Sequence, residues 1–209
     1  TRSATRAVRL GFVAVEASID LPGGFVREGA GAEVPIRRTS LDGAPRPGNG
    51  EWRLVELVQP ATSLMPAEEL VPMGAGGEPG DTIRTPGDAQ RPRWETGWVP
   101  ERALRGWAAG RELGQGRLSH DARGVATATL PKLSSGAYRI VYTTQDEFGA
   151  RYETAKALVV GGTRTKLQLP LLLRAEESMV KVGGTARLLV CSGLPGQVVY
   201  LDLFRGGKV

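Results

Sequence analysis

Short runs of alternating apolar residues, each closed by a Gly, Pro or Asp turn signal, most constrain what this chain can fold into. Seven such runs are predicted to be strands, at residues 8–19, 32–38, 52–58, 112–119, 125–130, 137–144 and 151–160. Turn signals separate them, as at residues 41–44 and 146–149. Seven short strands with regular turns predict an all-β fold, an antiparallel sandwich of the immunoglobulin type.

Three residues refine this sandwich. Pro35 has no N–H to donate, so we expect a free face or edge beside it. Tyr138 follows the turn at Gly136, where a tyrosine in such sandwiches hydrogen-bonds back across the corner. Ile140 stands where an antibody domain carries a disulfide cysteine. We therefore expect a sandwich held by packing alone.

The chain has one cysteine, Cys191, and one histidine, His120. These counts exclude an intrachain disulfide and a Cys/His zinc site within one chain. Cys191 lies in an apolar stretch, so we expect a buried core residue. His120 and Asp121 fall in a predicted turn, where Asp side chains bind the local backbone. We expect neither a metal nor a cofactor.

Residues 60–111 interrupt the strand pattern and are predicted to be an insertion. The stretch from residue 60 to residue 100 holds seven of the 14 prolines. Residues 72–92 are rich in Gly and Pro as well and are predicted to form a mobile surface loop. The acids Glu68, Glu69 and Asp88 lack the alternating spacing of a calcium loop.

The end of the insertion is predicted to be a short helix. Pro100 and Glu101 form a typical helix start. The apolar residues that follow form one stripe, made of Ala103, Leu104, Trp107 and Ala108. Three tryptophans lie nearby in the sequence, at positions 94, 98 and 107. We favour a small core that docks on the sandwich over an exposed aromatic platform.

The charge pattern restricts the partners. The chain has a net charge of +5, and 22 of its 27 basic residues are arginines. They are scattered, with no run longer than the pair at residues 37–38. A surface that tracks nucleic acid would cluster them. We therefore expect no nucleic-acid partner. No apolar stretch is long enough for a membrane span.

The pattern restarts after Gly162. Residues 179–190 parallel residues 25–36 at an offset of about 154, in a match that needs a one-residue gap. Both stretches run from apolar and basic residues through a Gly turn into a strand. We expect two domains, a sandwich at 1–162 with the insertion, and the opening strands of a second, incomplete sandwich at 163–209. We accordingly expect a segment of a longer polypeptide.

Several motifs together resemble the macroglobulin domains of the bacterial alpha-2-macroglobulin family. They are residues 26–29 (VREG), 41–43 (LDG), 130–140 (LPKLSSGAYRI), 146–149 (DEFG), 178–188 (SMVKVGGTARL) and 204–208 (FRGGK). The resemblance covers residues 8–58 and 112–209 and does not explain the insertion.

The resemblance implies a structural segment of a protease inhibitor, periplasmic or extracellular and membrane-anchored in some bacteria. Its partners would be proteases, reached through the full-length protein, and neighbouring macroglobulin domains. Cys191 is followed by Ser-Gly-Leu, so the family's Cys-x-Glu-Gln thioester motif is absent from this segment. Arg84, Arg91 and Arg93 would suit a trypsin-like protease if the loop is a bait segment, although Pro residues lie beside them.

Two other functions remain open from the residues alone. One is a binding or adhesion sandwich of a cell-surface protein, which a row of exposed tryptophans would favour. The other is an accessory module of a large secreted enzyme, which a neighbouring catalytic domain would favour. In none of these functions is the segment expected to be an enzyme.

Overall fold

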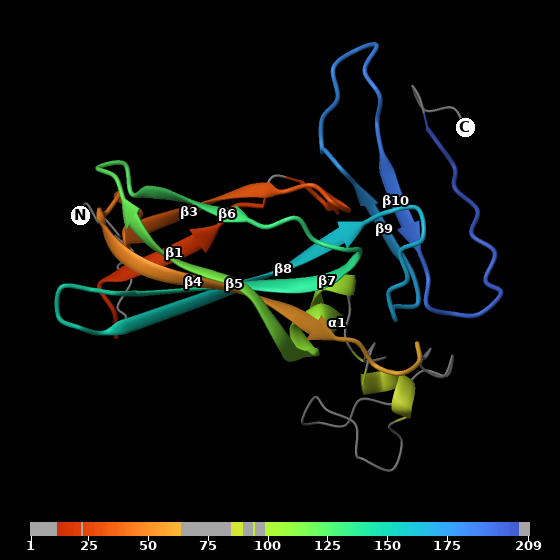
Figure 1. Ribbon diagram of the computed structural model, residues 1–209, viewed down its shortest axis with the longest axis horizontal. Helices are drawn as coiled ribbons and strands as arrows, with labels where there is room; N and C mark the ends of the chain where they lie inside the picture. Colours follow the sequence, from red (N-terminus) through yellow and green to blue (C-terminus); the bar gives the residue numbers. More distant parts are fainter. Residues whose placement is uncertain (1–11, 22, 64–84, 90–93, 95–98, 205–209) are drawn as a thin grey trace, which may run out of the picture.

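The computed structural model describes residues 12–21, 23–63, 85–89, 94 and 99–204 (Figure 1). This part of the chain is nearly all β. The elements in chain order are β1 (Val15–Ile19), β2 (Val26–Arg27), β3 (Ala32–Ser40), β4 (Gly48–Val58), the 3-10 helix η2 (Pro86–Ala89), α1 (Pro100–Gly106), β5 (Ala108–His120), β6 (Val125–Leu130), β7 (Gly136–Gln145), β8 (Arg151–Gly161), β9 (Leu172–Ala175) and β10 (Leu188–Cys191).

Two of the sheets pack face to face as a sandwich. One has the strand order β1-β3-β6 and the other β2-β8-β7-β4-β5. All pairs are antiparallel except β2 with β8, which is parallel. Inward-facing residues of both sheets form the core, and Ile36, Ile140 and Tyr142 are completely buried there. The third sheet, β9 with β10, lies beyond the end of β8 (Figure 1).

The predicted strands are present, with differences at their ends. The first begins at Val15, and residues 8–11 lie outside the described part. β4 begins at Gly48 and β5 at Ala108, so four residues of the expected insertion belong to the sheet. A bulge in the pairing of β4 with β5 lets the strand continue to Ala108. The two-residue strand β2 was not predicted.

Pro35 lies in the middle strand of the three-stranded sheet, not beside a free edge of the sheet. Its carbonyl accepts a hydrogen bond from the N–H of Asp20, at 2.9 Å. Asp20 follows the last residue of β1. Since the N and C=O of one residue in an antiparallel strand face the same neighbour, the absent N–H falls where β1 has already ended.

The tyrosine corner is confirmed. Tyr138 Oη donates to the carbonyl of Ser134 at 2.8 Å, which ties the start of β7 to the preceding turn. Two glycines of β5 also have a structural role. Trp52 of β4 lies against Gly114 and Gly116 of β5, so the missing side chains leave room for the indole ring.

Candidate functional site

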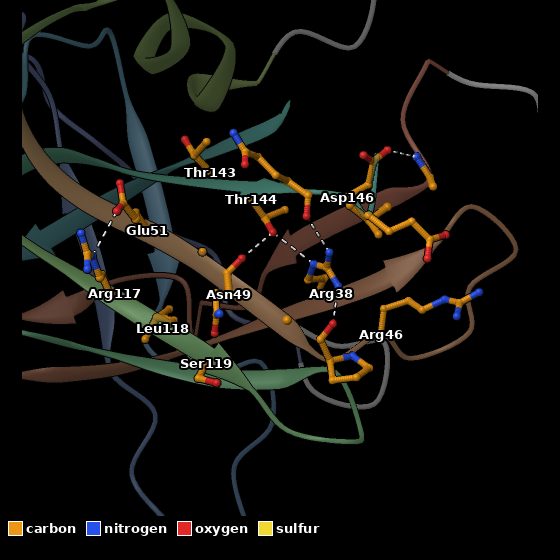
Figure 2. A pocket seen from close by; sticks show the side chains of 17 residues that line it. Arg38, Arg46, Asn49, Glu51, Arg117, Leu118, Ser119, Thr143, Thr144 and Asp146 are labelled. Carbon is orange, nitrogen blue, oxygen red and sulfur yellow. Dashed lines mark hydrogen bonds and ion pairs between the residues drawn. The ribbon is translucent and has the colours of Figure 1, made fainter. Parts of the chain in front are cut away.

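An open hollow of about 1020 Å³ lies at one end of the sandwich (Figure 2). It is lined by the end of β3, the start of β4, the end of β5 and the turn that joins β7 to β8. Its side chains are mostly polar, and they include Arg38, Arg46, Asn49, Glu51, Arg117 and Asp146. The chemistry that this cavity can perform depends on how these groups are already bound.

The guanidinium of Arg38 forms the buried floor of the cavity, and the residue is only 6% exposed. Its Nε donates to Thr144 Oγ1 at 3.1 Å, and its Nη2 donates to the carbonyl of Gln145 at 2.7 Å. A third bond runs from Nη1 to the carbonyl of Pro47. Arg38 belongs to one sheet and its acceptors from β7 to the other, so this side chain closes the end of the sandwich.

Two carboxylates of the cavity, those of Asp146 and Glu51, are also engaged. Asp146 accepts hydrogen bonds from the backbone N–H groups of Ala14, Phe148 and Ala150, at 2.8, 3.0 and 2.8 Å. The bond from Ala14 contributes most to lowering the pKa of Asp146, and the charge of Arg38 adds to it. Glu51 pairs with Arg117 at 3.3 Å in an exposed position. The polar groups of this cavity therefore fasten turns and strand ends.

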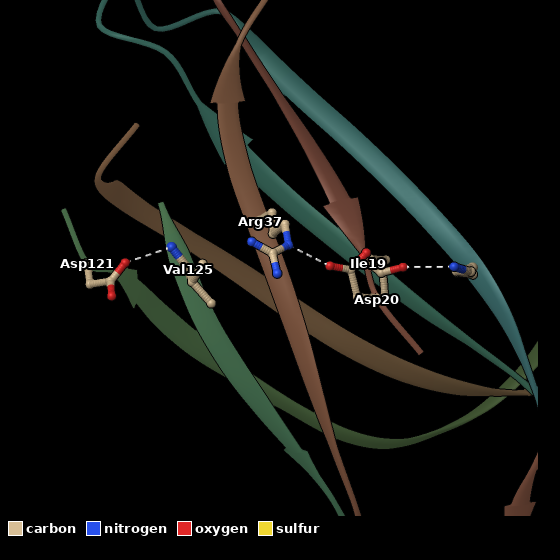
Figure 3. A network of polar contacts seen from close by, with 6 residues as sticks. Ile19, Asp20, Arg37, Asp121 and Val125 are labelled. Carbon is tan, nitrogen blue, oxygen red and sulfur yellow. Dashed lines mark hydrogen bonds and ion pairs between the residues drawn. The ribbon is translucent and has the colours of Figure 1, made fainter. Parts of the chain in front are cut away.

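His120 and Asp121 do not act as a pair. Asp121 accepts hydrogen bonds from the N–H of Arg123, at 3.0 Å, and from the N–H of Val125, at 2.9 Å, and so shapes the turn. Figure 3 shows the contact with Val125. His120 is buried, with Nδ1 3.1 Å from the carbonyl of Gly48, and no described residue bonds its Nε2. Burial is the largest cause that lowers the pKa of His120. The prediction of a turn is confirmed for Asp121, whereas His120 is the buried last residue of β5 and not part of the turn.

The predicted bait residues Arg84, Arg91 and Arg93 lie outside the described residues, as do Glu68, Glu69 and Trp98. Asp88 is described, and its carboxylate accepts hydrogen bonds from the N–H and the hydroxyl of Thr85, at 2.6 and 2.9 Å. Among the described residues no group of three or more His, Cys, Asp or Glu side chains is placed to hold a metal ion. No described helix is long and apolar enough to cross a membrane.

A second apolar cluster, which we call the junction cluster, lies on the outer face of the five-stranded sheet. The sandwich contributes Phe25, Leu57, Ala137 and Val159, the end of the insertion contributes Ala103, Leu104 and Trp107, and the C-terminal region contributes Leu167, Leu169, Leu172, Leu189 and Cys191. The predicted docking of the helix is thereby confirmed for Trp107, and Ala108 is instead exposed at the start of β5. The predicted burial of Cys191 is confirmed, and burial raises the pKa of its thiol.

Arg139 of β7 fixes α1 to the outer face of the sheet. Its Nη2 donates to the carbonyls of Leu104, Arg105 and Trp107, at 2.8, 2.8 and 2.9 Å. These are carbonyls at the end of a helix, which have no partner within the helix itself. Burial lowers the pKa of the Arg139 guanidinium. One side chain therefore caps α1 and attaches it to the sandwich.

Polar contacts complete the junction. The N–H of Gly24 donates to the carbonyl of Glu176 at 3.1 Å, and the N–H of Gln168 donates to Gln59 Oε1 at 2.9 Å. The carboxylate of Glu176 also pairs with Arg27 at 2.8 Å. Sequence reasoning missed this junction, although the apolar run at residues 167–173 (LQLPLLL) was a signal for it.

Comparison with known proteins finds structural likenesses, and the one described here is of low similarity. No family model matches the chain, and no curated protein matches it. A crystal structure of trypsin-activated alpha-2-macroglobulin from Escherichia coli is similar at 10% sequence identity and a TM-score of 0.39. That match covers 78% of this chain and 9% of the other, so the chain spans less than a tenth of that protein's length.

Proposed function

We propose that this chain is a non-enzymatic scaffold segment built from tandem sandwiches, in a protease inhibitor of the macroglobulin type. The observation that carries the tandem arrangement is the pairing of β9 with β10, which repeats the pairing of β1 with β3 in the same register. The inhibitor role rests on the motifs of residues 130–140 and 178–188, which resemble the bacterial macroglobulin domains.

The register of the two hairpins supports the repeat. In the sandwich, Ile19 pairs with Ile36. Adding 154 to both numbers gives Leu173 and Val190, which are partners in the C-terminal sheet. The turn before each second strand also corresponds, because Gly29 and Gly183 have φ angles of 74° and 82° and lie 154 residues apart. The repeat therefore needs no gap, in contrast to the one-residue gap expected from the sequence.

The burial pattern supports the second hairpin as part of a larger sandwich. The core-facing residues of the first hairpin are Ala17, Ile19, Val34 and Ile36. Their counterparts at the offset of 154 are Leu171, Leu173, Leu188 and Val190, which are 38%, 50%, 43% and 38% exposed. A half-exposed apolar face on a two-stranded sheet is the surface that a second sheet covers in a sandwich. We infer that residues 163–209 are the opening strands of a second domain.

The other roles follow from this assignment. The segment would act on proteases only through the whole inhibitor, in a periplasmic or extracellular setting. Cleavage within the insertion, at Arg84, Arg91 or Arg93, would be its one direct contact with a protease. The alternative of a Trp-lined binding module is disfavoured, because Trp107 is buried in the junction cluster.

The test of the repeat compares Val190→Ser with Ile36→Ser in the 209-residue chain. Since Val190 is partly exposed and Ile36 is fully buried, Ile36→Ser should unfold the sandwich. Val190→Ser should leave the denaturant midpoint of the sandwich unchanged. It should reduce the binding of an apolar fluorescent dye to the exposed face of the hairpin. In the polypeptide as its gene encodes it, Val190→Ser should become strongly destabilising. No destabilisation there would contradict the second domain.

The inhibitor role is tested separately with the polypeptide as its gene encodes it. After incubation with trypsin, an enclosing inhibitor should block the cleavage of a large protein substrate while a small peptide substrate is still hydrolysed. Equal rates on both substrates, with and without the protein, would refute the inhibitor role and would leave the tandem arrangement intact.

A further inference from the structure

We propose that α1 is a removable strut, which holds the C-terminal hairpin of β9 and β10 at a fixed orientation to the sandwich and can leave the junction cluster while the sandwich stays folded. This inference concerns the contacts within the chain and does not depend on the inhibitor role.

The strut belongs to an apolar cluster that the sandwich and the hairpin share. Leu104 of α1 is fully buried in a cluster that contains Val159 of the sandwich and Leu189 of the hairpin. The hairpin also meets the sandwich directly, because Gly161 lies against Leu189. Polar contacts between the two include the Gly24 and Gln168 hydrogen bonds and the pair of Arg27 with Glu176. The Arg27 side chain is mostly exposed, and exposed ion pairs contribute little to stability.

The helix α1 also depends on tertiary contacts for its stability. α1 has seven residues and no side-chain hydrogen bond at its N-terminal cap. A helix of this length is marginal by itself, so α1 depends on its packing and on the carbonyl contacts of Arg139. By contrast, β7 is paired along its length with both β4 and β8. Elements with few contacts open locally at lower free energy than paired central strands.

The junction is specific to the second hairpin. At the offset of 154, its docking residues Leu172, Leu189 and Cys191 correspond to Ser18, Pro35 and Arg37 of the first hairpin. In the first hairpin Arg37 is exposed and pairs with Asp20 at 2.8 Å (Figure 3). The two other positions carry no large apolar side chain. Only the second hairpin, among the described residues, therefore has an apolar face that shares a cluster with α1.

The lone cysteine supplies a reporter for opening. Cys191 lies in the junction cluster and is 8% exposed. A thiol reagent reaches a buried cysteine only when the protein opens around it, and burial itself keeps the thiolate scarce. The rate of Cys191 modification in the native chain therefore measures how often the junction opens.

The experiment measures this rate with an aromatic disulfide reagent in the 209-residue chain and in three variants. Leu104→Ala removes the buried anchor of α1, and Arg139→Met removes the carbonyl contacts while keeping an aliphatic side chain. Arg53→Met is the matched control, since Arg53 is exposed on β4, which neighbours β7 in the sheet. Hydrogen exchange of the β7 amides is followed in parallel, as the measure of the sandwich itself.

We expect Cys191 to react at least tenfold faster in Leu104→Ala, which corresponds to about 1.4 kcal/mol. Arg139→Met should react severalfold faster and Arg53→Met at the native rate, with β7 equally protected in all of them. An unchanged rate in both α1 variants would overturn the proposal. So would a rate that rises only in proportion to the exchange of the β7 amides, because α1 would then stabilise the whole fold. If Leu104→Ala does not fold, Arg139→Met decides.

Discussion

Replacing Gly116 by Ala should destabilise the sandwich, whereas replacing Gly114 by Ala in the same strand should not. Both glycines of β5 face the ring of Trp52. A Cβ at position 116 would lie 2.8 Å from Trp52 Nε1 and 3.3 Å from Cε2. A Cβ at position 114 would lie 3.4 Å from Cη2, which is an ordinary contact. The two positions therefore form a matched pair against one ring.

The magnitude follows from two opposing effects. Alanine is favoured over glycine within a strand by about 0.5–1 kcal/mol, because glycine loses more conformational freedom on folding. Forcing extra atoms into a packed core costs about 1–3 kcal/mol. Trp52 is 8% exposed and belongs to the main core, so its ring has little room to move. Gly116→Ala should lower the free energy of unfolding by about 1–2 kcal/mol, and Gly114→Ala should raise it by about 0.5 kcal/mol.

The assay is urea denaturation of both variants, followed by far-ultraviolet circular dichroism. A shift of the same sign and size in both would refute the account, because the distances to the ring would then be irrelevant. The cause is tested by adding Trp52→Leu to Gly116→Ala. If the ring is responsible, the penalty of the alanine should disappear in this background, with a coupling energy of about 1 kcal/mol or more.

Three further predictions concern single polar groups. Tyr138→Phe removes the hydrogen bond to Ser134 and should lower the free energy of unfolding by about 1 kcal/mol, with no change in the urea m-value. For His120, the folded-state pKa lies below the ordinary value of 6.5, so the unfolded chain binds more protons as the pH falls. The free energy of unfolding should be highest above about pH 6.5 and should fall below it, by at most about 1.4 kcal/mol per pH unit. Urea midpoints measured from pH 7.5 to 5 should show this slope in the native chain and lack it in His120→Phe. Arg38→Met leaves buried acceptors unpaired and should cost about 3 kcal/mol or more, whereas Arg37→Met on the exposed side of the same strand should cost less than about 1 kcal/mol in thermal unfolding.

The sandwich strands could be predicted because their signal is local. Alternation with a period of two places Val34 and Ile36 on one face, and the turns are given by Gly and Asp residues beside them. The corner tyrosine could be predicted for the same reason, since Tyr138 and its acceptor Ser134 are four residues apart. Helix α1 was found from its proline start and its apolar stripe.

The junction and the cavity could not be predicted, because their contacts join residues far apart in sequence. Arg38 meets Thr144 at a separation of 106 residues. Alternation places Arg38 on the face of Val34 and Ile36 and Arg37 on the opposite face, but it does not reveal the partners of Arg38. Arg139 likewise caps a helix 32 to 35 residues away. Strand alternation predicts which face a side chain occupies, but the depth of burial depends on how the sheets close.

The two ends of the sandwich are held by different forces, and this difference determines how each can respond. With one cysteine the chain has no covalent link between its sheets, and cationic side chains provide the link instead. Arg38 reaches from β3 to β7, and Lys156 donates from β8 to the carbonyl of Ile19 in β1, at 3.0 Å. Unlike a disulfide, such bonds act only in the folded state and leave the unfolded ensemble unconstrained.

The opposite end, at the junction cluster, depends on apolar burial around a short helix. Removing α1 would partly expose apolar side chains and would take three carbonyl acceptors from Arg139, which is only half-buried. This energetic penalty is smaller than that of unpairing the buried Arg38. An opening of the chain should therefore begin at the junction cluster, before the end closed by Arg38. The order of these events follows from chemistry already present in the fold, namely a buried guanidinium at one end and a marginal helix at the other.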